Sequence, residues 1–195
     1  MTAPQPDRHA LLSPSSAYKW MKCNGSIALE QAVGAEDKAG PSASAGTFMH
    51  HVAAKALTEH KNAVDYLGYK EVVDGIEFTF DPEHAALVQV YLDTVWTYVG
   101  LDGVLFVEQA LDISFLTGEA DAIGTADAIV IRGDELIVID LKTGRNGVKA
   151  LCNNQLVIYS MAALKAYQEG KLTAPVTPAA VENTPPPVDD GDDLC

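Results

Sequence analysis

Residues 124–159 read GTADAIVIRGDELIVIDLKTGRNGVKALCNNQLVIY. Two apolar runs stand at the start of this stretch, with the turn residues Arg-Gly-Asp between them. Asp127 heads the first run, and the second run ends in Asp140-Leu141-Lys142. Runs of this length and nearly unbroken apolar character predict two strands, Ala126–Ile131 and Glu135–Ile139, that are covered on both faces.

The short turn predicts that these two strands form an antiparallel hairpin. A turn at residues 132–134 pairs residues whose numbers sum to about 266 or 267. Asp127 and Asp140 sum to 267, so we expect their side chains to lie opposite each other. Lys142 stands two residues beyond Asp140 and projects to the same face of an extended chain.

Two facing carboxylates and a lysine suit phosphodiester hydrolysis. Adjacent carboxylates repel unless a cation lies between them, and oxygen ligands suit Mg²⁺ or Mn²⁺. Such an ion polarises a phosphate, while Lys142 stabilises the charge that develops on it. The alternative is that Asp140 and Lys142 form an ordinary surface ion pair, which is the commoner use of such a pair.

Composition indicates one soluble domain in the cytoplasm. The chain has 195 residues, 48% hydrophobic and 21% charged, which suits a single core. No apolar run reaches the roughly 20 residues that span a membrane, and the N-terminus lacks the apolar centre of a signal peptide. The three cysteines Cys23, Cys152 and Cys195 form no disulfide framework and cannot supply the four ligands of an iron–sulfur cluster.

The net charge of −14 opposes binding to nucleic acid. Five acids in residues 171–195 stand against one lysine, which leaves about −10 on the rest of the chain. A bound divalent ion offsets such charge locally. The Pro-rich, acidic residues 171–195 have little to bury and predict a disordered tail.

The N-terminal half predicts two helices after a lead of residues 1–12. Ser13-Pro14-Ser15 begins the first, Ser15–Leu29, in which Cys23 is a small buried hydrophobe, with a reactive or metal-binding thiol as the less favoured alternative. Residues 34–46 form a loop of small residues. The second helix runs from Gly46 to about Lys61 with Thr47 as its cap.

The remaining elements follow from turn signals and periodicity. Lys70–Phe80 predicts a hairpin around Asp74-Gly75, and Asp81–Val99 a helix with a core-facing stripe that includes Leu87 and Tyr91. Val104–Ile113 predicts a strand in which Glu108 points either to the site or to solvent. Asn153–Gln168 predicts a helix with Gln155 and Tyr159 on one face.

These residues resemble the PD-(D/E)XK nuclease superfamily, specifically its RecB-like exonuclease branch of phage and prophage type. The similar segments are Gly124-Thr-Ala-Asp127, Asp140-x-Lys142 and Gln155-x3-Tyr159, together with Ser13-Pro-Ser15, Trp20, Cys23 and Gly46-Thr47-x-x-His50 further upstream. The helix Asp81–Val99 is similar too. The resemblance covers roughly residues 9–168.

Position by position, the resemblance implies His50, Asp127, Asp140 and the backbone carbonyl of Leu141 as metal ligands. Lys142 is the implied catalytic lysine. Gln155 and Tyr159 orient the substrate or brace the site, and Glu108 supports the ligands without binding the ion. Adjacent helical residues point about 100° apart, so His51 is a bystander.

The implied fold is α/β (α+β), a mixed central sheet flanked by helices, over residues 13–170. The implied function is a DNA nuclease, an exonuclease of phage recombination or replication in the bacterial host cytoplasm, with Mg²⁺ or Mn²⁺ and no iron–sulfur cluster. The acidic tail suits a single-strand-binding or recombination protein as partner. The alternative is an inactive nuclease fold that serves as a binding or assembly module.

Overall fold

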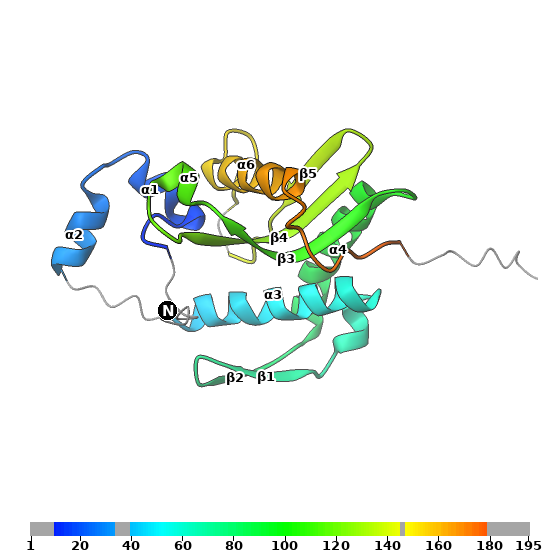
Figure 1. Cartoon of the computed structure of the whole chain (residues 1–195). Coiled ribbons are helices and arrows are strands. Elements are labelled where there is room, and N and C mark those ends of the chain that lie inside the picture. The colour runs from blue at the N-terminus through cyan, green and yellow to red at the C-terminus, as the bar shows by residue number, and fades with distance from the viewer. Residues whose placement is uncertain (1–9, 34–39, 145–146, 179–195) are drawn as a thin grey trace, which may run out of the picture.

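The computed structural model describes residues 10–33, 40–144 and 147–178. The chain order of its helices and strands is shown in Figure 1. The elements are η1 (Pro14–Ser16), α1 (Ala17–Trp20), α2 (Ser26–Val33), α3 (Pro41–Glu59), η2 (Ala63–Tyr66), β1 (Lys70–Val73), β2 (Ile76–Thr79), α4 (Pro82–Val99), β3 (Val104–Asp112), α5 (Ser114–Thr117), β4 (Ile123–Arg132), β5 (Glu135–Ile139) and α6 (Asn154–Gln168).

A three-stranded sheet in the order β3-β4-β5 forms the middle of the molecule. Helix α6 lies over one face, and α3 lies along the other (Figure 1). Each face has its own apolar core, and Ile129 of β4 packs with the α6 side while Ala128 and Val130 pack with the α3 and α4 side. The prediction of strands covered on both faces is therefore confirmed.

The protein is a mixture of helices and small antiparallel sheets. All strand pairings among the described residues are antiparallel, so the expectation of a mixed sheet is not met in this part of the chain. The predicted β-hairpin is confirmed as β1 and β2, a separate two-stranded sheet below α3 (Figure 1). Its turn residues Asp74 and Gly75 both have positive φ, as a tight hairpin turn requires.

Side-chain caps place the starts of two helices where the sequence predicted them. The Asp81 carboxylate accepts a hydrogen bond from the backbone N–H of His84 and begins α4. The Asn153 side chain accepts from the backbone N–H groups of Gln155 and Leu156 and begins α6. Each cap satisfies backbone donors that a helix start would otherwise leave open.

The prediction of a single helix over Ser15–Leu29 is wrong. The 3-10 turn η1 is followed by the short α1, which ends at Trp20, and α2 begins only at Ser26. Asn24-Gly25 lies between them, and both residue types disfavour a continuous helix. Cys23 is exposed in this break, so the prediction of a buried cysteine is also wrong.

Helix α3 begins at Pro41, five residues before the predicted start at Gly46. Gly40 is its N-cap and Pro41 its first residue, a favoured position for proline because no partner is needed for the missing N–H. Thr47 is not a cap, since its hydroxyl donates to the Ala43 carbonyl inside the helix. Residues 34–39 of the expected loop lie outside the described residues.

The chain after α6 returns to the sheet. Val176 exchanges two backbone hydrogen bonds with Leu105 of β3, at 2.9 and 2.7 Å, and packs against the core. Order therefore continues beyond Gly170, where the disordered tail was expected to begin. The rest of that tail, residues 179–195, lies outside the described residues. None of the described helices combines the length and the apolar character that crossing a membrane requires.

Gly124 lets the N-terminal turn and α6 meet over β4. A Cβ at this position would lie 3.0 Å from both Pro14 Cγ and Tyr159 Cε1. We expect Gly124→Ala to lower the free energy of unfolding by about 1–3 kcal/mol, the usual cost of overpacking. Urea denaturation measures the change. Gly147→Ala is the control because nothing lies within 4 Å of its added Cβ, and equal stability of the two variants would contradict this account.

Candidate metal centre

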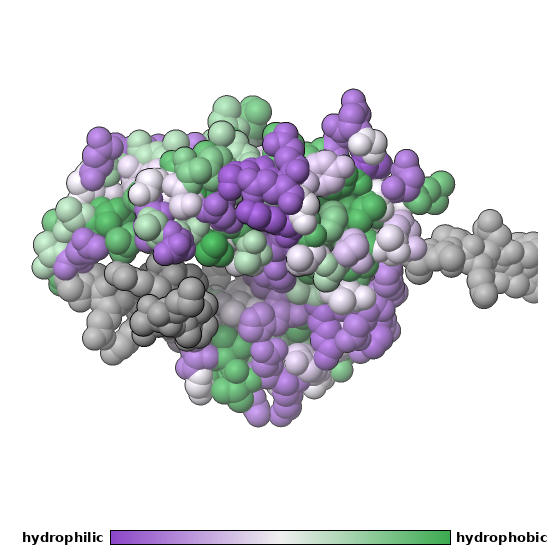
Figure 2. All heavy atoms as spheres, in the orientation of Figure 1, coloured by the Kyte–Doolittle hydropathy of each residue, from purple (hydrophilic) through white to green (hydrophobic). Residues whose placement is uncertain are grey.

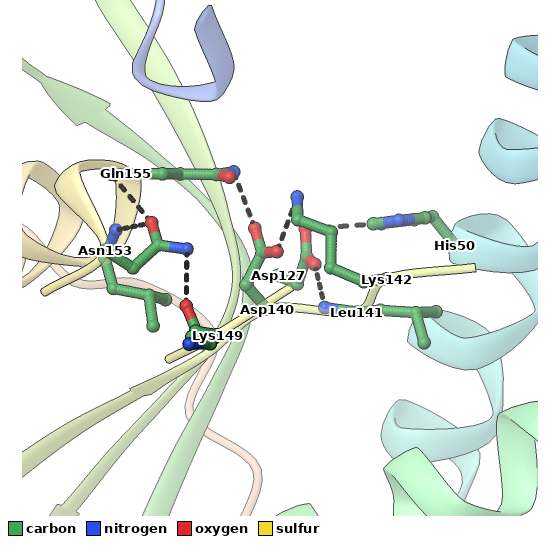
Figure 3. Close-up of polar contacts among 9 residues, drawn as sticks. His50, Asp127, Asp140, Leu141, Lys142, Lys149, Asn153 and Gln155 are labelled. Carbon is green, nitrogen blue, oxygen red and sulfur yellow. Dashed lines mark hydrogen bonds and ion pairs between the residues drawn. The ribbon is translucent and has the colours of Figure 1, made fainter. Parts of the chain in front are cut away.

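His50, Glu108 and Asp127 come together from three elements. Each offers one ligand atom, and these atoms all lie within 4.8 Å of one another. His50 reaches the group from α3, and its Nδ1 lies 3.3 Å from Asp127 Oδ1. Figure 3 shows the His50 side chain pointing from the helix toward Asp127 on β4. The group has the mixed nitrogen and carboxylate character of a divalent metal site.

Only one of the two adjacent histidines faces this group. His51 Nδ1 lies 2.7 Å from Glu71 Oε1 of the β1–β2 hairpin. The prediction that at most one histidine would face a given site is therefore confirmed, and His50 is the one that does. The rotation of about 100° between neighbouring helical residues is the cause.

An irregularity in the pairing of β3 with β4 directs the carboxylates of Glu108 and Asp127 toward His50. The β3–β4 ladder pairs Val107 with Ala128 and Gln109 with Ala126, so Glu108 stands opposite Asp127. Glu108 has φ 48°, a left-handed conformation that residues other than glycine seldom adopt. A strained residue of this kind often marks a functional position.

In both β3 and β4, side chains at alternate positions point to one face of the sheet before the Glu108–Asp127 pair and to the other face after it. On β3, Leu105 lies in the α3 and α4 core, whereas Leu111, of the same parity, lies in the α6 core. On β4, Ala128 lies in the α3 and α4 core and Ala126 in the α6 core. The alternation of side chains with a period of two therefore breaks here, where both carboxylates reach His50 of α3.

Asp140 lies beside this group at the end of β5. The β4–β5 ladder pairs Ala128 with Ile139 and Ile129 with Val138, which is the predicted register and continues to Asp127 opposite Asp140. Figure 3 shows the two side chains next to each other. The register prediction from the hairpin turn is confirmed.

Both oxygens of Asp140 already have partners. Oδ1 accepts from Gln155 Nε2 at 2.7 Å, and Oδ2 lies 2.7 Å from Lys142 Nζ. The Asp140 side chain is only 7% exposed, whereas that of Lys142 is 40% exposed. Asp140 is thus held in place by two polar neighbours, and Lys142 keeps its ammonium group accessible to solvent.

The backbone that follows Asp140 is tied to the same centre. The Leu141 N–H donates to Asp127 Oδ2 at 2.7 Å (Figure 3). Gly46 of α3 faces the next part of this segment, since a Cβ there would lie 3.3 Å from Thr143 Oγ1. Contacts with β4 and α3 therefore fix the segment that carries Lys142.

We call His50, Glu108 and Asp127 the close group. Its carboxylates differ from those of the predicted ligand set, because it contains Glu108 in place of Asp140. Asp140 was predicted as a ligand, and its oxygens are engaged by Gln155 and Lys142. Glu108 was predicted only to support the ligands, and its carboxylate belongs to the close group with His50. The roles of all these residues in metal binding stay predictions.

Helix α6 brings Gln155 and Tyr159 beside the centre, where the resemblance implies that they orient the substrate or brace the site. Gln155 holds Asp140, and the Asn153 cap fixes the backbone of Gln155. Tyr159 is buried against Gly124. Burial raises the pKa of the Tyr159 hydroxyl above its ordinary value, and the Asp140 charge raises it further. We therefore assign Gln155 to positioning and Tyr159 to bracing.

Crowding of the acids raises several pKa values. Removal of water from the Glu108 carboxyl group, which still contacts solvent, raises its pKa to about 7, and the Asp127 charge contributes. Burial and Asp127 also raise the pKa of Asp140, although Lys142 opposes this. Burial lowers the pKa of His50, but its hydrogen bond to Asp127 and the nearby acids outweigh burial and raise it overall. A cation would relieve this repulsion.

Tyr91 is the site residue that sequence reasoning missed. It was predicted as part of the core-facing stripe of α4, and it is buried. Burial raises the pKa of its hydroxyl well above the ordinary value, and the charges of Asp127, Glu108 and Asp140 raise it further. Tyr91 of α4 is therefore close enough to the centre for the charges of these three acids to act on its hydroxyl. Its helical spacing carries no signal that separates it from ordinary core residues.

We expect the metal-free protein to lose stability as the pH rises from about 5 to about 8. Glu108 and His50 have raised pKa values in the folded protein, so the folded state keeps protons that the unfolded chain has released. This contribution is present at low pH and is lost as the pH passes the folded pKa values. Melting temperatures measured in a chelator across this range test the expectation.

The control for the pH experiment is Glu108→Gln, which removes the main titrating group. The variant should show a flatter pH dependence than the wild type. Saturating Mn²⁺ should reverse the trend, because metal ligands bind in their deprotonated forms. A metal-free stability that rises over the same pH range would contradict the prediction.

Residues 9–170 match the family described as "Protein of unknown function (DUF2800)". The chain belongs to this family. The matched region contains every residue of the candidate centre, from His50 to Tyr159. No solved structure matches the chain.

Proposed function

We propose that this DUF2800 protein is a metal-dependent nuclease that hydrolyses the phosphodiester bonds of DNA. The observation that carries the proposal is the close group of His50, Glu108 and Asp127 beside the ion pair of Asp140 and Lys142. Metal ligands next to a solvent-accessible lysine are the parts that hydrolysis of a phosphodiester needs.

The donor set fits Mg²⁺ or Mn²⁺. Carboxylate oxygens are the preferred ligands of both ions, and an imidazole nitrogen favours Mn²⁺ among them. His50, Glu108 and Asp127 would hold the ion, with Asp140 and the Leu141 carbonyl as the further predicted ligands. A bound ion would polarise the phosphate and lower the pKa of a coordinated water.

Lys142 would act on the phosphate itself. Asp140 holds its Nζ at 2.7 Å beside the acidic group, so the ammonium is positioned before substrate binds. It would donate to a phosphoryl oxygen and stabilise the negative charge that develops there. Gln155 keeps Asp140 in place through Oδ1 and thereby fixes the lysine indirectly.

The distribution of charge supports DNA as the substrate despite the net charge of −14. The stretch from Leu141 to Gln168 contains Lys142, Arg145, Lys149 and Lys165 and no Asp or Glu. Lys165 is paired with acids and Lys142 with Asp140, but the lack of acidic residues gives this stretch of sequence a net positive charge. Phosphate contacts need such a local region rather than a basic protein overall.

The surface between the sheet layer and the layer of α3 would receive the nucleic acid, because His50 of α3 meets Asp127 of the sheet there. Figure 2 shows hydrophilic residues on the visible face of both layers. The resemblance to RecB-like nucleases of phage type extends the proposal to a PD-(D/E)XK core and to exonuclease action in phage recombination or replication.

The test compares end-labelled linear DNA with closed circular DNA in Mg²⁺ and in Mn²⁺. We expect linear DNA to be degraded from its ends while the circle remains intact. Asp140→Ala should abolish the degradation, and His51→Ala, which changes the neighbour that faces Glu71, should not. Intact DNA with both ions, from a protein that the metal stabilises, would contradict the enzyme proposal.

The second candidate is an inactive nuclease fold that binds or assembles with other molecules. The acidic composition favours it. Titration with Mn²⁺ separates the two, because an ion that binds the folded state at one hundred times its Kd stabilises it by about 2.7 kcal/mol. A melting temperature that does not change in millimolar Mn²⁺ would favour the inactive fold.

A further inference from the structure

The outward face of α4 carries a seam of two apolar residues and two threonines with heptad spacing. Leu87 and Thr94 are seven residues apart, as are Val90 and Thr97, so the four occupy positions a and d of two heptads. All four are exposed, with Leu87 at 53% and Val90 at 67%. Leu87 was predicted to face the core, and the structure corrects this.

A groove lies along the same seam. Its volume is about 340 Å³, and it is lined by Val90, Asp93, Thr94, Thr97 and Tyr98. Residues 90, 93, 94 and 97 have the spacing i, i+3, i+4, i+7, which is the set of four that forms the hole for a side chain of another helix. Scattered apolar residues on a surface are ordinary, but this spacing around a hollow is the geometry of helix–helix packing.

We propose that α4 packs in parallel against α4 of a second copy of this chain. In the heptad frame Asp93 is at position g and Tyr98 is at the following position e. A parallel pair of helices brings g next to e of the other copy, so each Tyr98 hydroxyl would donate to Asp93 of the second copy. The seam is thus complementary to itself.

The polar contacts on α4 agree with this arrangement. Asp93 Oδ1 accepts from Gln89 Nε2 at 2.8 Å, whereas Oδ2 has no hydrogen bond within the described part of the chain. Helix α4 contains no Lys or Arg, so a donor for Asp93 must be neutral or come from elsewhere. An antiparallel pair would instead bring Asp93 close to its own copy, and like charges repel.

Sedimentation velocity of the full chain tests the dimer, from about 1 µM to about 1 mM protein. We expect a monomer that converts to a dimer as concentration rises, and more readily at high salt, since screening reduces the repulsion between two acidic chains. Val90→Glu should remain a monomer. Val72→Glu is the matched control, because Val72 is 64% exposed on β1 and lies outside the seam, and it should dimerise like the wild type.

Cysteine cross-linking tests the orientation in a variant in which Cys23, Cys152 and Cys195 are serine. Val90→Cys should form a disulfide with its own copy, because equivalent d positions meet only in a parallel pair. Cross-linking of Thr94→Cys without Val90→Cys would establish the antiparallel pair and overturn the orientation. A wild type that stays monomeric at every concentration would overturn the proposal. A Val90→Glu variant that dimerises like the wild type would overturn it too. Neither experiment depends on nuclease activity.

Discussion

Replacing Asp127 with asparagine should abolish both divalent-metal binding and DNA hydrolysis. Asp127 is the central member of the close group, since one oxygen lies 3.3 Å from His50 Nδ1 and the other accepts from the Leu141 N–H. Asparagine has the same shape and its amide oxygen still accepts from Leu141, so the fold is retained. It lacks the negative charge by which a carboxylate ligand attracts a divalent ion.

We expect hydrolysis to fall by at least about a hundredfold, since loss of the ion removes several kcal/mol of transition-state stabilisation. The stabilisation by Mn²⁺ should disappear in the same variant. The two measurements are DNA degradation and the shift in melting temperature with Mn²⁺.

His51→Asn is the control for Asp127→Asn. It alters a neighbour of the centre that contacts Glu71 rather than the close group of His50, Glu108 and Asp127, so hydrolysis and the Mn²⁺ shift should both remain. An Asp127→Asn variant that still shows the full Mn²⁺ shift would contradict the assignment of this centre as the metal site.

Replacing Lys142 with methionine should remove hydrolysis and leave metal binding in place. The ammonium group is proposed to stabilise charge on the phosphate, and loss of one such donor typically costs about a hundredfold to a thousandfold in rate. Methionine preserves most of the length and the apolar part of the side chain. Since Lys142 holds down the pKa of Asp140, the variant should also have a higher Asp140 pKa.

Lys149→Met is the control for Lys142→Met. Lys149 is exposed in the same loop, and Figure 3 shows it near Asn153 and away from the group around Asp127. Its replacement should weaken DNA binding slightly and leave the rate at saturating DNA unchanged. A Lys142→Met variant that degrades DNA at the wild-type rate would exclude Lys142 as the catalytic lysine.

The two variants also separate the enzyme from the inactive fold. An enzyme loses hydrolysis in both, with metal binding lost only in Asp127→Asn. An inactive module has no hydrolysis to lose and no melting-temperature shift with Mn²⁺, so neither variant should differ from the wild type in these two measurements. The pattern across both variants, rather than either alone, decides between the two functions.

Local signals in the sequence predicted much of the fold. The Asp74-Gly75 turn placed the first hairpin, because both residues accept positive φ. The caps at Asp81 and Asn153 placed the starts of two helices. The length of the turn between the apolar runs set Asp127 opposite Asp140 through the pairing register.

The same signals misplaced two helices near the N-terminus. The apolar spacing over Ser15–Leu29 resembled one helix, but α2 has no buried residue, so no core interaction spans the break at Asn24-Gly25. Helix α3 begins at Pro41, in a run of small residues that reads as a loop. Its early turns pack against the segment after Asp140, as the contact between Gly46 and Thr143 shows, and no pattern of neighbouring residues encodes such a contact.

By itself, the sequence determined the hairpin register, the starts of α4 and α6, and that at most one of His50 and His51 faces a given site, because turns, caps and helical rotation act within a few residues. Only the tertiary structure decided that Glu108 joins His50 and Asp127 in the close group and that the charges of the acids there act on the buried Tyr91. The physical reason is the left-handed backbone at Glu108. It breaks the alternation of β3, and nothing short of the packed sheet and α3 determines toward which face that carboxylate turns.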